Sequence, residues 1–353
     1  MNRYTQLLER ALLKQQKNEN LTYLLDDLMQ ISAQINEEQR AASSKPVSLA
    51  AASIDFMNRI SVKASSLSIL TGFNDFDKKT NGFAKGELVI FGGRPGMGKT
   101  ALLVQMALTM ARAENNVAYF TLDLNNDLLV LRFLSALTGF SAYQIRSGTL
   151  SDEEKLVLEQ CLNDLSKSSI CIDDNPTHIL QLKEKCRQLH SEGKLDVLIV
   201  DYIQLLNGTS YRNGGNREME VSTICRELKN IAREFDVCVI AASQLSRAVE
   251  SRGGDKRPML SDLRESGSIE QDADKVVFIY RPEYYKISED ENGNSLLNAM
   301  ELILAKNRNG LVCNSALEIK NNFSLFTDHP GFKELEDLIA ARKDEWSGDP
   351  SPF

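Results

Sequence analysis

Eight consecutive residues combine the types and spacing that bind a nucleoside triphosphate. The run Gly93-Arg94-Pro95-Gly96-Met97-Gly98-Lys99-Thr100 fits the pattern G-x-x-x-x-G-K-[ST] in full. Its three glycines permit turns closed to residues with a Cβ, so that successive N–H groups can point at phosphate oxygens. Lys99 would reach the β- and γ-phosphates of ATP, and the Thr100 hydroxyl would take one coordination site on Mg²⁺. The run therefore predicts a phosphate-binding loop.

An acidic residue and an amide are placed to complete this predicted site. Residues 195–201 read Leu-Asp-Val-Leu-Ile-Val-Asp, an apolar strand that ends in Asp201. At the carboxyl edge of a parallel sheet, Asp201 would lie opposite Thr100 and hold Mg²⁺ through water. Ser243-Gln244 ends the next predicted strand, where Gln244 could sense a γ-phosphate. The alternative for Gln244 is a side-chain amide at the edge of the sheet whose hydrogen bonds are satisfied there and that has no role in ATP binding.

These side chains need a parallel sheet with crossover helices to position them. From Leu70 onward, apolar runs of strand length alternate with helical runs, which is typical of an α/β fold. One strand precedes the glycine-rich loop and a helix at 101–113 follows it. The predicted strands are 87–91, 117–122, 170–173, 197–201, 237–242 and 276–280, followed by a hairpin of 300–306 and 316–320.

Capping residues set the ends of two further predicted helices. Ser151 and Glu154 form a capping box at the start of a helix that runs to Lys167. Thr177 can cap a second helix that runs through residue 190, and Gly193 would end it.

Composition restricts the class of protein. The 353 residues carry a formal net charge of −8, which argues against a protein that coats nucleic acid with its whole surface. No apolar stretch reaches the length of a membrane span, and no signal peptide is recognisable, so we expect a cytoplasmic protein without a membrane partner. The six cysteines and three histidines show no metal-ligand spacing, which favours reduced core thiols and helix-end or surface histidines.

The N-terminal part is expected to be helical. Residues 1–46 form a short segment with a thin apolar stripe and end in a linker-like Ala-Ala-Ser-Ser-Lys-Pro. Residues 47–69 then contain a second amphipathic stretch with apolar side chains that include Leu49 and Ile54. This face would dock on a neighbouring subunit or, alternatively, on its own domain. The main domain is expected at 70–330, and a charged tail at 331–353.

Two loops carry basic side chains near the predicted site. One holds Arg247, Arg252, Lys256, Arg257 and Arg264 around a Gly-Gly pair, and the other, 207–216, holds Tyr211 and Arg212. Such loops beside an ATP site suit contact with a phosphate backbone without reading of bases. Because acidic residues are interspersed, solvated surface loops are the alternative interpretation.

Residues 260–274, Leu-Ser-Asp-Leu-Arg-Glu-Ser-Gly-Ser-Ile-Glu-Gln-Asp-Ala-Asp, resemble a signature of replicative hexameric DNA helicases of the DnaB type. Four other stretches agree, at 71–77, 201–206, 242–247 and 306–310, and the resemblance spans about residues 47–326. It implies a RecA-like P-loop domain with a central, mostly parallel twisted sheet flanked by helices, preceded by a short helical segment. It also implies a homohexameric ring that hydrolyses ATP, moves on single-stranded DNA and separates the duplex during replication.

The resemblance assigns roles to individual residues. It makes Gln244 the γ-phosphate sensor and Asp123 the general base, and it makes Lys306 and Arg308 cations that reach the ATP of the neighbouring subunit. Residues 47–63 would form the linker helix that docks on the adjacent protomer. In the central channel, single-stranded DNA would be contacted by Arg264, Glu265 and Gly267, with Glu265 acting through its backbone.

The chain departs from the family pattern in three places. Asp123 stands where the family has a glutamate, so its carboxylate is one methylene shorter and hydrolysis should be slower. Leu311 replaces the usual proline after Asn309-Gly310. The 46 residues before Val47 are too few for the family's globular collar, although a primase or helicase loader is a further partner that the resemblance implies.

Three other functions remain as alternatives to the helicase. A RecA-like recombination or repair ATPase and a non-translocating regulatory ring share the same loop. A nucleotide or sugar kinase would need an acceptor pocket and no oligomer.

Overall fold

The structure is a computed structural model that describes residues 48–51, 53–54, 57, 68–175, 178–208, 217–254, 256–263, 267–289, 293 and 295–329. The predicted N-terminal segment 1–46 and tail 331–353 lie outside these ranges, as do most residues of the predicted linker 47–69. Residues 49–51, 53–54 and 57 of that linker are helical.

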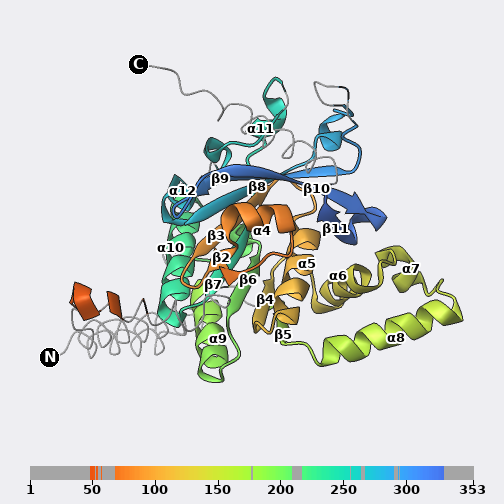
Figure 1. Ribbon diagram of the computed structural model, residues 1–353, viewed down its shortest axis with the longest axis horizontal. Coiled ribbons are helices and arrows are strands. Elements are labelled where there is room, and N and C mark those ends of the chain that lie inside the picture. Colours follow the sequence, from red (N-terminus) through yellow and green to blue (C-terminus); the bar gives the residue numbers. More distant parts are fainter. Residues whose placement is uncertain are drawn as a thin grey trace, which may run out of the picture.

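One sheet organises the described chain, and in that part it contains nine strands (Figure 1). The six strands from β8 to β5 pair in parallel, and β9, β10 and β11 extend the β8 side as antiparallel strands. The predicted α/β class with a mostly parallel sheet is thus confirmed. Across the sheet the strands are β11 (Leu325–Asp328), β10 (Cys313–Lys320), β9 (Ala299–Asn307), β8 (Lys275–Tyr280), β3 (Leu88–Gly93), β7 (Cys238–Gln244), β6 (Val197–Asp201), β4 (Val117–Thr121) and β5 (Ile170–Asp173).

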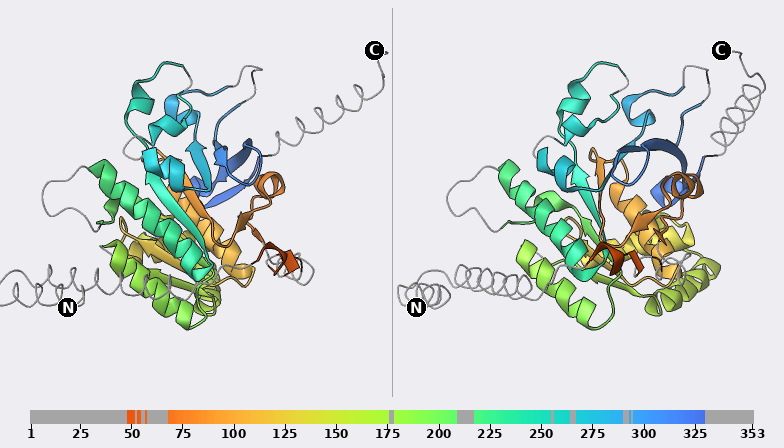
Figure 2. Two further views of the ribbon diagram at one scale, coloured as in Figure 1. Left: turned by 90° about the vertical axis from the view of Figure 1, so that its left-hand side faces the viewer. Right: turned by 60° about the vertical axis from the view of Figure 1, so that its left-hand side comes forward.

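Both faces of the sheet are covered because alternate side chains of its strands enter two different cores. In β3, Val89 and Phe91 belong to one hydrophobic cluster, whereas Leu88 and Ile90 belong to the other. Helices α5 (Lys99–Arg112) and α6 (Asn126–Thr138) contribute to the first cluster. Helices α9 (Ile179–Ser191) and α10 (Arg217–Phe235) contribute to the second, on the opposite face (Figure 2).

Further helices, turns and a small ribbon surround this frame. The helices are α4 (Asn74–Thr80), α7 (Ala142–Ser147), α8 (Asp152–Ser166), α11 (Ala248–Ser251) and α12 (Gly267–Asp272). The 3-10 turns are η1 (Ile203–Leu205), η2 (Leu260–Asp262), η3 (Glu283–Tyr285) and η4 (Asn321–Phe323), and β1 (Ser68–Ile69) pairs with β2 (Phe83–Ala84) in a separate ribbon. Within the described ranges, no helix is long and apolar enough to cross a membrane.

The predicted helix caps are confirmed for α8 and corrected for α9. Ser151 and Glu154 make the reciprocal bonds of a capping box. The N-cap of α9 is His178 and not Thr177, which lies outside the described residues. Nδ1 of His178 accepts a hydrogen bond from the Leu180 N–H at 3.1 Å. An imidazole nitrogen thus satisfies a free N–H of the first turn, the task usually given to a hydroxyl. Gly193 follows the helix end at φ +68°, as predicted.

The chain enters the domain through a loop that one carboxylate holds in place. Asp77 accepts hydrogen bonds from the N–H and hydroxyl of Thr71 and from the N–H of Gly72, at 2.8–2.9 Å. Burial raises the pKa of Asp77, and these hydrogen bonds oppose the rise. Phe73 and Phe76 are buried beneath the loop. The stretch at 71–77 therefore has a structural function.

The C-terminal end of the domain returns to this same loop. Strand β11 was not predicted from the sequence, because its two apolar residues are followed by two polar ones, which gives neither an apolar run nor an alternating pattern. Its last residue, Asp328, accepts hydrogen bonds from the N–H groups of Asn74 (3.1 Å) and Asp75 (3.3 Å) at the start of α4. Helix α4 is thus capped by a residue that lies 254 positions after Asn74 in the chain.

Candidate functional site

The glycine-rich loop connects β3 to α5, as the sequence predicted. Gly96 and Gly98 have φ values of +77° and +94°, a region that L side chains rarely adopt. Helix α5 begins at Lys99 immediately after Gly98, so its free N–H groups and positive dipole end lie at the loop. This geometry is suited to an anion.

Gly93 does not need to be a glycine for conformational reasons. It is the last residue of β3, and its φ lies outside the left-handed region. A Cβ at this position would meet Lys99 Cγ at 3.4 Å and Ile279 Cβ at 3.5 Å, which are near ordinary contact distances. The expectation that all three glycines permit special turns therefore holds for Gly96 and Gly98 only.

A cavity lies beside the glycine-rich loop, at the carboxyl edge of the sheet, and only some residues of the loop line it. Pro95, Gly96, Gly98, Lys99 and Thr100 line it. Met97 is buried in the first hydrophobic core. The side chain of Arg94 is also buried, and it donates hydrogen bonds to Glu250 Oε1 and to the carbonyl oxygen of Leu245, each at 2.8 Å. Arg94 thus joins the loop to the segment that follows β7.

Lys99 is a half-buried cation held by neutral groups. Its Nζ donates to the carbonyl oxygens of Gly93 (2.8 Å) and Arg94 (3.1 Å). Burial lowers the pKa of Lys99 to about 8, while the nearby charge of Asp201 acts in the opposite direction. An anionic ligand would replace the lost solvation and favour the protonated amine.

Asp201 lies where the sequence placed it, at the end of β6 and opposite the loop. It is 2% exposed and accepts hydrogen bonds from the hydroxyls of Thr100 and of Tyr119, the latter at 3.1 Å. Burial raises its pKa, and the hydrogen bonds from Thr100 and Tyr119 oppose this effect. A carboxylate bonded to the Thr100 hydroxyl is an oxygen-donor pair that suits Mg²⁺.

Asp123 follows β4 and lines the same cavity. It lies in a bend held by Thr121, whose hydroxyl accepts a hydrogen bond from the N–H of Leu124 at 3.1 Å. The N–H of Leu122 in turn donates to the carbonyl oxygen of Asp201 at 2.8 Å. Both acidic residues are therefore carried by the ends of adjacent strands, and Asp123 is the more exposed of the two.

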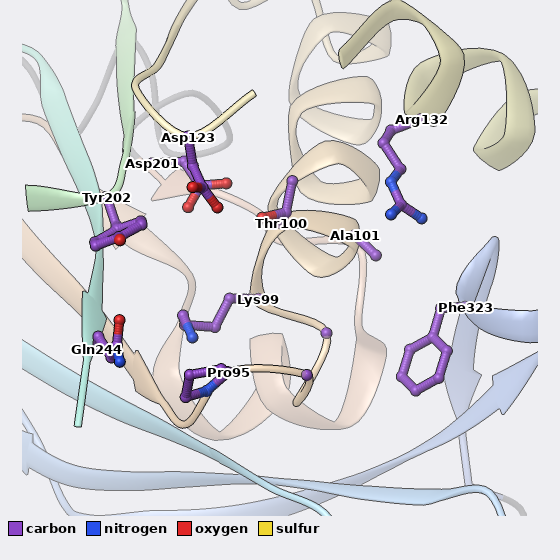
Figure 3. A pocket seen from close by; sticks show the side chains of 12 residues that line it. Pro95, Lys99, Thr100, Ala101, Asp123, Arg132, Asp201, Tyr202, Gln244 and Phe323 are labelled. Atoms are coloured by element: carbon purple, nitrogen blue, oxygen red, sulfur yellow. The ribbon is translucent and has the colours of Figure 1, made fainter. Parts of the chain in front are cut away.

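Gln244 ends β7 and also lines the cavity, beside Tyr202 and Lys99 (Figure 3). The structure thus brings together five predicted side chains around one cavity of about 500 Å³. They are Lys99, Thr100, Asp123, Asp201 and Gln244.

Four residues that line the cavity are not among the predicted site residues: Ala101, Arg132, Tyr202 and Phe323. Arg132 of α6 and Phe323 of η4 lie on the side opposite the two acidic residues (Figure 3). The Arg281 guanidinium lies over the Phe323 ring, 4.3 Å from its centroid, and donates to the Gly96 carbonyl oxygen at 3.2 Å. An aromatic ring beside the phosphate loop could stack on a flat base. No motif precedes Arg132 or Phe323, so only the fold reveals them.

Lys306 and Arg308 lie far from this cavity. They are at the end of β9 that pairs with the start of β8, at the amino edge of the parallel strands. Lys306 donates to the carbonyl oxygens of Glu270, Gln271 and Ala273 near the end of α12. Arg308 donates to Asp274 Oδ1 at 3.2 Å and to the Gln271 carbonyl oxygen. They do not reach the phosphate loop of their own chain.

Two of the predicted DNA-binding arginines are paired within the chain. Arg252 binds the buried carboxylate of Asp262 and the carbonyl oxygen of Arg257. Arg257 binds Glu301, and its guanidinium lies 5.3 Å from the centroid of the Tyr280 ring. Gly267 is the first residue of α12. Arg212, Arg264 and Glu265 lie outside the described residues.

Comparison with known proteins gives consistent matches. Residues 68–328 match the DnaB-like helicase C-terminal domain family. Over 262 residues the chain is 45% identical to the replicative DNA helicase DnaC of Bacillus subtilis, a match that covers 74% of this chain and 56% of that protein. Replicative DNA helicase DnaB of Geobacillus stearothermophilus is 44% identical over the same length, with the same coverage. The chain thus spans little more than half the length of these curated relatives.

Two solved structures share the fold and about a third of the sequence. One, described as an ATPase domain, superimposes with a TM-score of 0.73 at 32% identity, covering 81% of this chain and 100% of that one. A DnaB-like replicative helicase, described together with its interactions with primase, gives a TM-score of 0.71 at 31% identity. That match covers 92% of this chain and 75% of the other. From the family match and these identities, the chain belongs to the DnaB-like helicase C-terminal domain family.

Proposed function

We propose that this chain is the motor of a ring-forming, ATP-driven DNA helicase that acts in replication. The observation that carries the proposal is the cavity at the carboxyl edge of the sheet. It gathers a phosphate-binding lysine, a hydroxyl, two carboxylates and an amide from four separate segments. Family membership supports coupling of ATP use at this site to DNA rather than to a small acceptor.

ATP would bind with its phosphates along 95–100 and its base toward Phe323. Thr100 and Asp201 would hold Mg²⁺, which would neutralise charge on the β- and γ-phosphates. The donors present fit this ion, since both are oxygens and Asp201 already accepts a hydrogen bond from the Thr100 hydroxyl. Lys99 would exchange its two carbonyl partners for phosphate oxygens.

Asp123 would act as the general base for the attacking water, and Gln244 would sense the γ-phosphate. Lys306 and Arg308 would act on the ATP of the next subunit in a homohexamer. Their position at the amino edge supports this, because they cannot serve their own cavity. Hydrolysis would then depend on assembly.

The assembly contact would involve the helical residues of 47–69. Leu49 is 84% exposed and Ile54 is 64% exposed. On α7 and α8, Tyr143, Leu156 and Leu162 are exposed as well, and no residue of α8 is buried. We propose that the 47–69 helix of one copy docks on α7 and α8 of the next, since each apolar face needs a cover.

Single-stranded DNA would be contacted by Arg212, Arg264 and Glu265 and by Gly267 at the start of α12. Arg252 and Arg257 would either exchange their carboxylate partners for phosphates or hold the shape of the loop at 246–263. We also propose a cytoplasmic location and a primase or helicase loader as a further partner. A structurally similar helicase is described with primase, which supports this choice.

Strand displacement on a forked duplex tests the proposal. The full chain should form a ring, hydrolyse ATP faster when single-stranded DNA is added, and separate the strands. Lys99→Ala should abolish hydrolysis and strand separation, whereas Lys194→Ala, a matched change at a lysine whose side chain is 61% exposed, should not. A ring that hydrolyses ATP without separating strands would contradict the helicase function. A monomer that phosphorylates a small acceptor would indicate a kinase instead.

A further inference from the structure

The last residue of β7 lacks a strand neighbour on one side. Strand β6 pairs with β7 only from Cys238 to Ala241, although β7 continues to Gln244. On the other side, β3 accompanies β7 to its end, where Gly93 is opposite Gln244. The peptide groups that the end of β7 turns toward β6 must therefore find other partners.

The side chain of Gln204 supplies them. Its Oε1 accepts a hydrogen bond from the Gln244 N–H at 3.1 Å, and its Nε2 donates to the Gln244 carbonyl oxygen at 3.2 Å. Nε2 also donates to the hydroxyl of Ser243, which is fully buried, at 2.9 Å. A primary amide holds a donor and an acceptor in fixed geometry. It can therefore bind the N–H and the carbonyl oxygen of one residue, as a neighbouring strand would.

Gln204 is itself fixed by the start of α10. Its carbonyl oxygen accepts a hydrogen bond from Arg217, which also donates to the Leu206 carbonyl oxygen at 3.2 Å. Arg217 pairs with Glu220, and Oε1 of Glu220 accepts from the Gly208 N–H at 2.8 Å. The pairing thus connects the end of β7 to the first turn of α10.

We infer that Gln204 is a positioning residue for ATP hydrolysis: it sets the backbone of Gln244 and thereby aims the Gln244 amide into the cavity. The inference rests on the proposed sensor role of Gln244. Figure 3 shows the Gln244 side chain in the wall beside Lys99 and Tyr202. A sensor that rotates with its peptide group would lose alignment with the γ-phosphate without any change in the residues that hold the other phosphates.

The test compares two glutamines that pair with a backbone in the same way. Gln105 of α5 also binds both groups of one residue, accepting from the Phe326 N–H at 2.7 Å and donating to its carbonyl oxygen at 2.6 Å. Gln105 does not line the cavity. Gln204→Met and Gln204→Glu would be measured beside Gln105→Met and Gln105→Glu in the full chain. Each Met change removes every hydrogen bond of the amide, three at Gln204 and two at Gln105, without adding charge.

We expect kcat for ATP to fall about tenfold in both Gln204 variants, with KM for ATP within about twofold of the parent. The Gln105 variants should keep the parental kcat even where their Tm falls by a similar amount. A purely structural role of Gln204 predicts the same outcome for both pairs and would overturn the inference.

The variant Gln244→Ala distinguishes the positioning role of Gln204 from the sensor role of Gln244 on which it depends. If Gln244→Ala slows hydrolysis but Gln204→Met does not, the positioning role is wrong and the sensor role stands. If Gln244→Ala hydrolyses ATP at the parental rate, the sensor role fails, and the positioning role fails with it.

Discussion

Lys99 at the carboxyl edge of the parallel strands and two lysines at the amino edge have different kinds of partner. At the carboxyl edge, Lys99 donates to carbonyl oxygens and carries a pKa lowered to about 8 by burial. At the amino edge, Lys229 pairs with Asp274 at 2.5 Å and Lys275 pairs with Glu87 at 2.5 Å. A cation held by neutral groups keeps its charge for an anionic ligand, whereas a cation paired with a carboxylate contributes to the fold.

The amino edge also contains the cations expected to act in trans. Arg308 shares Asp274 with Lys229, and Asn309 donates to Glu87 Oε1 at 2.8 Å. The turn at 307–310 is therefore attached to the ion pairs of the sheet. Its position is set by the fold, while the carboxyl edge is left open for a ligand.

Breaking an amino-edge pair should give the largest effect. Lys275→Met would leave Glu87 buried without its cation, which should lower the free energy of unfolding by about 3–5 kcal/mol. Affinity for nucleotide should change little, because the cavity is at the other edge. Chemical denaturation and nucleotide titration measure the two quantities. A loss below about 1 kcal/mol would remove the structural role of this pair.

Removing Lys99, the cation at the carboxyl edge, should lower activity and leave stability almost unchanged. Lys99→Ala should slow ATP hydrolysis by at least about 100-fold, roughly 3 kcal/mol of transition-state stabilisation. Its free energy of unfolding should stay within about 1 kcal/mol of the parent, because Lys99 donates to two neutral carbonyl oxygens and leaves no buried carboxylate at hydrogen-bond distance without its cation. Steady-state kinetics and denaturation test this. Equal damage to activity and stability would contradict the comparison.

The lowered pKa of Lys99 predicts a pH dependence of nucleotide binding. The free site loses the lysine proton near pH 8, and bound phosphate would raise the pKa, because it favours the charged amine. Affinity for ADP should therefore be constant below about pH 7 and fall above about pH 8, approaching about tenfold per pH unit. Titration with Mg²⁺ chelated measures it, and Lys99→Met should lose the dependence. An affinity for ADP that rises with pH would contradict this prediction.

The smallest effect is expected at Asp123. Asp123→Glu should raise kcat severalfold, since the longer side chain brings the carboxylate nearer to the attacking water. Stability should not change, because Asp123 is exposed. ATPase assays with and without single-stranded DNA measure the gain. If Asp123→Ala hydrolyses ATP as fast as the parent, Asp123 is not the base.

The sequence predicted the carboxyl edge better than the amino edge, for physical reasons. Lys99, Thr100 and Asp201 belong to local patterns that parallel strands bring to one edge, so spacing was sufficient. Phe323 comes from an element without a motif, and its place depends on how η4 packs. The amide of Gln204 lies in a recognisable stretch, yet its pairing depends on where β6 ends. The ion pairs of the amino edge join residues that are distant in sequence, so only the fold reveals them.

The bond between Asp328 and the start of α4 has a consequence for chain topology. Because Asn74 and Asp328 are in direct contact, the first and last parts of the family-matched region lie next to each other. A flexible linker from residue 329 to residue 68 would therefore join two parts of the chain that the fold already brings together. New ends could then be opened at the exposed Lys167, between α8 and β5, to give a circularly permuted domain whose central strand order is unaltered.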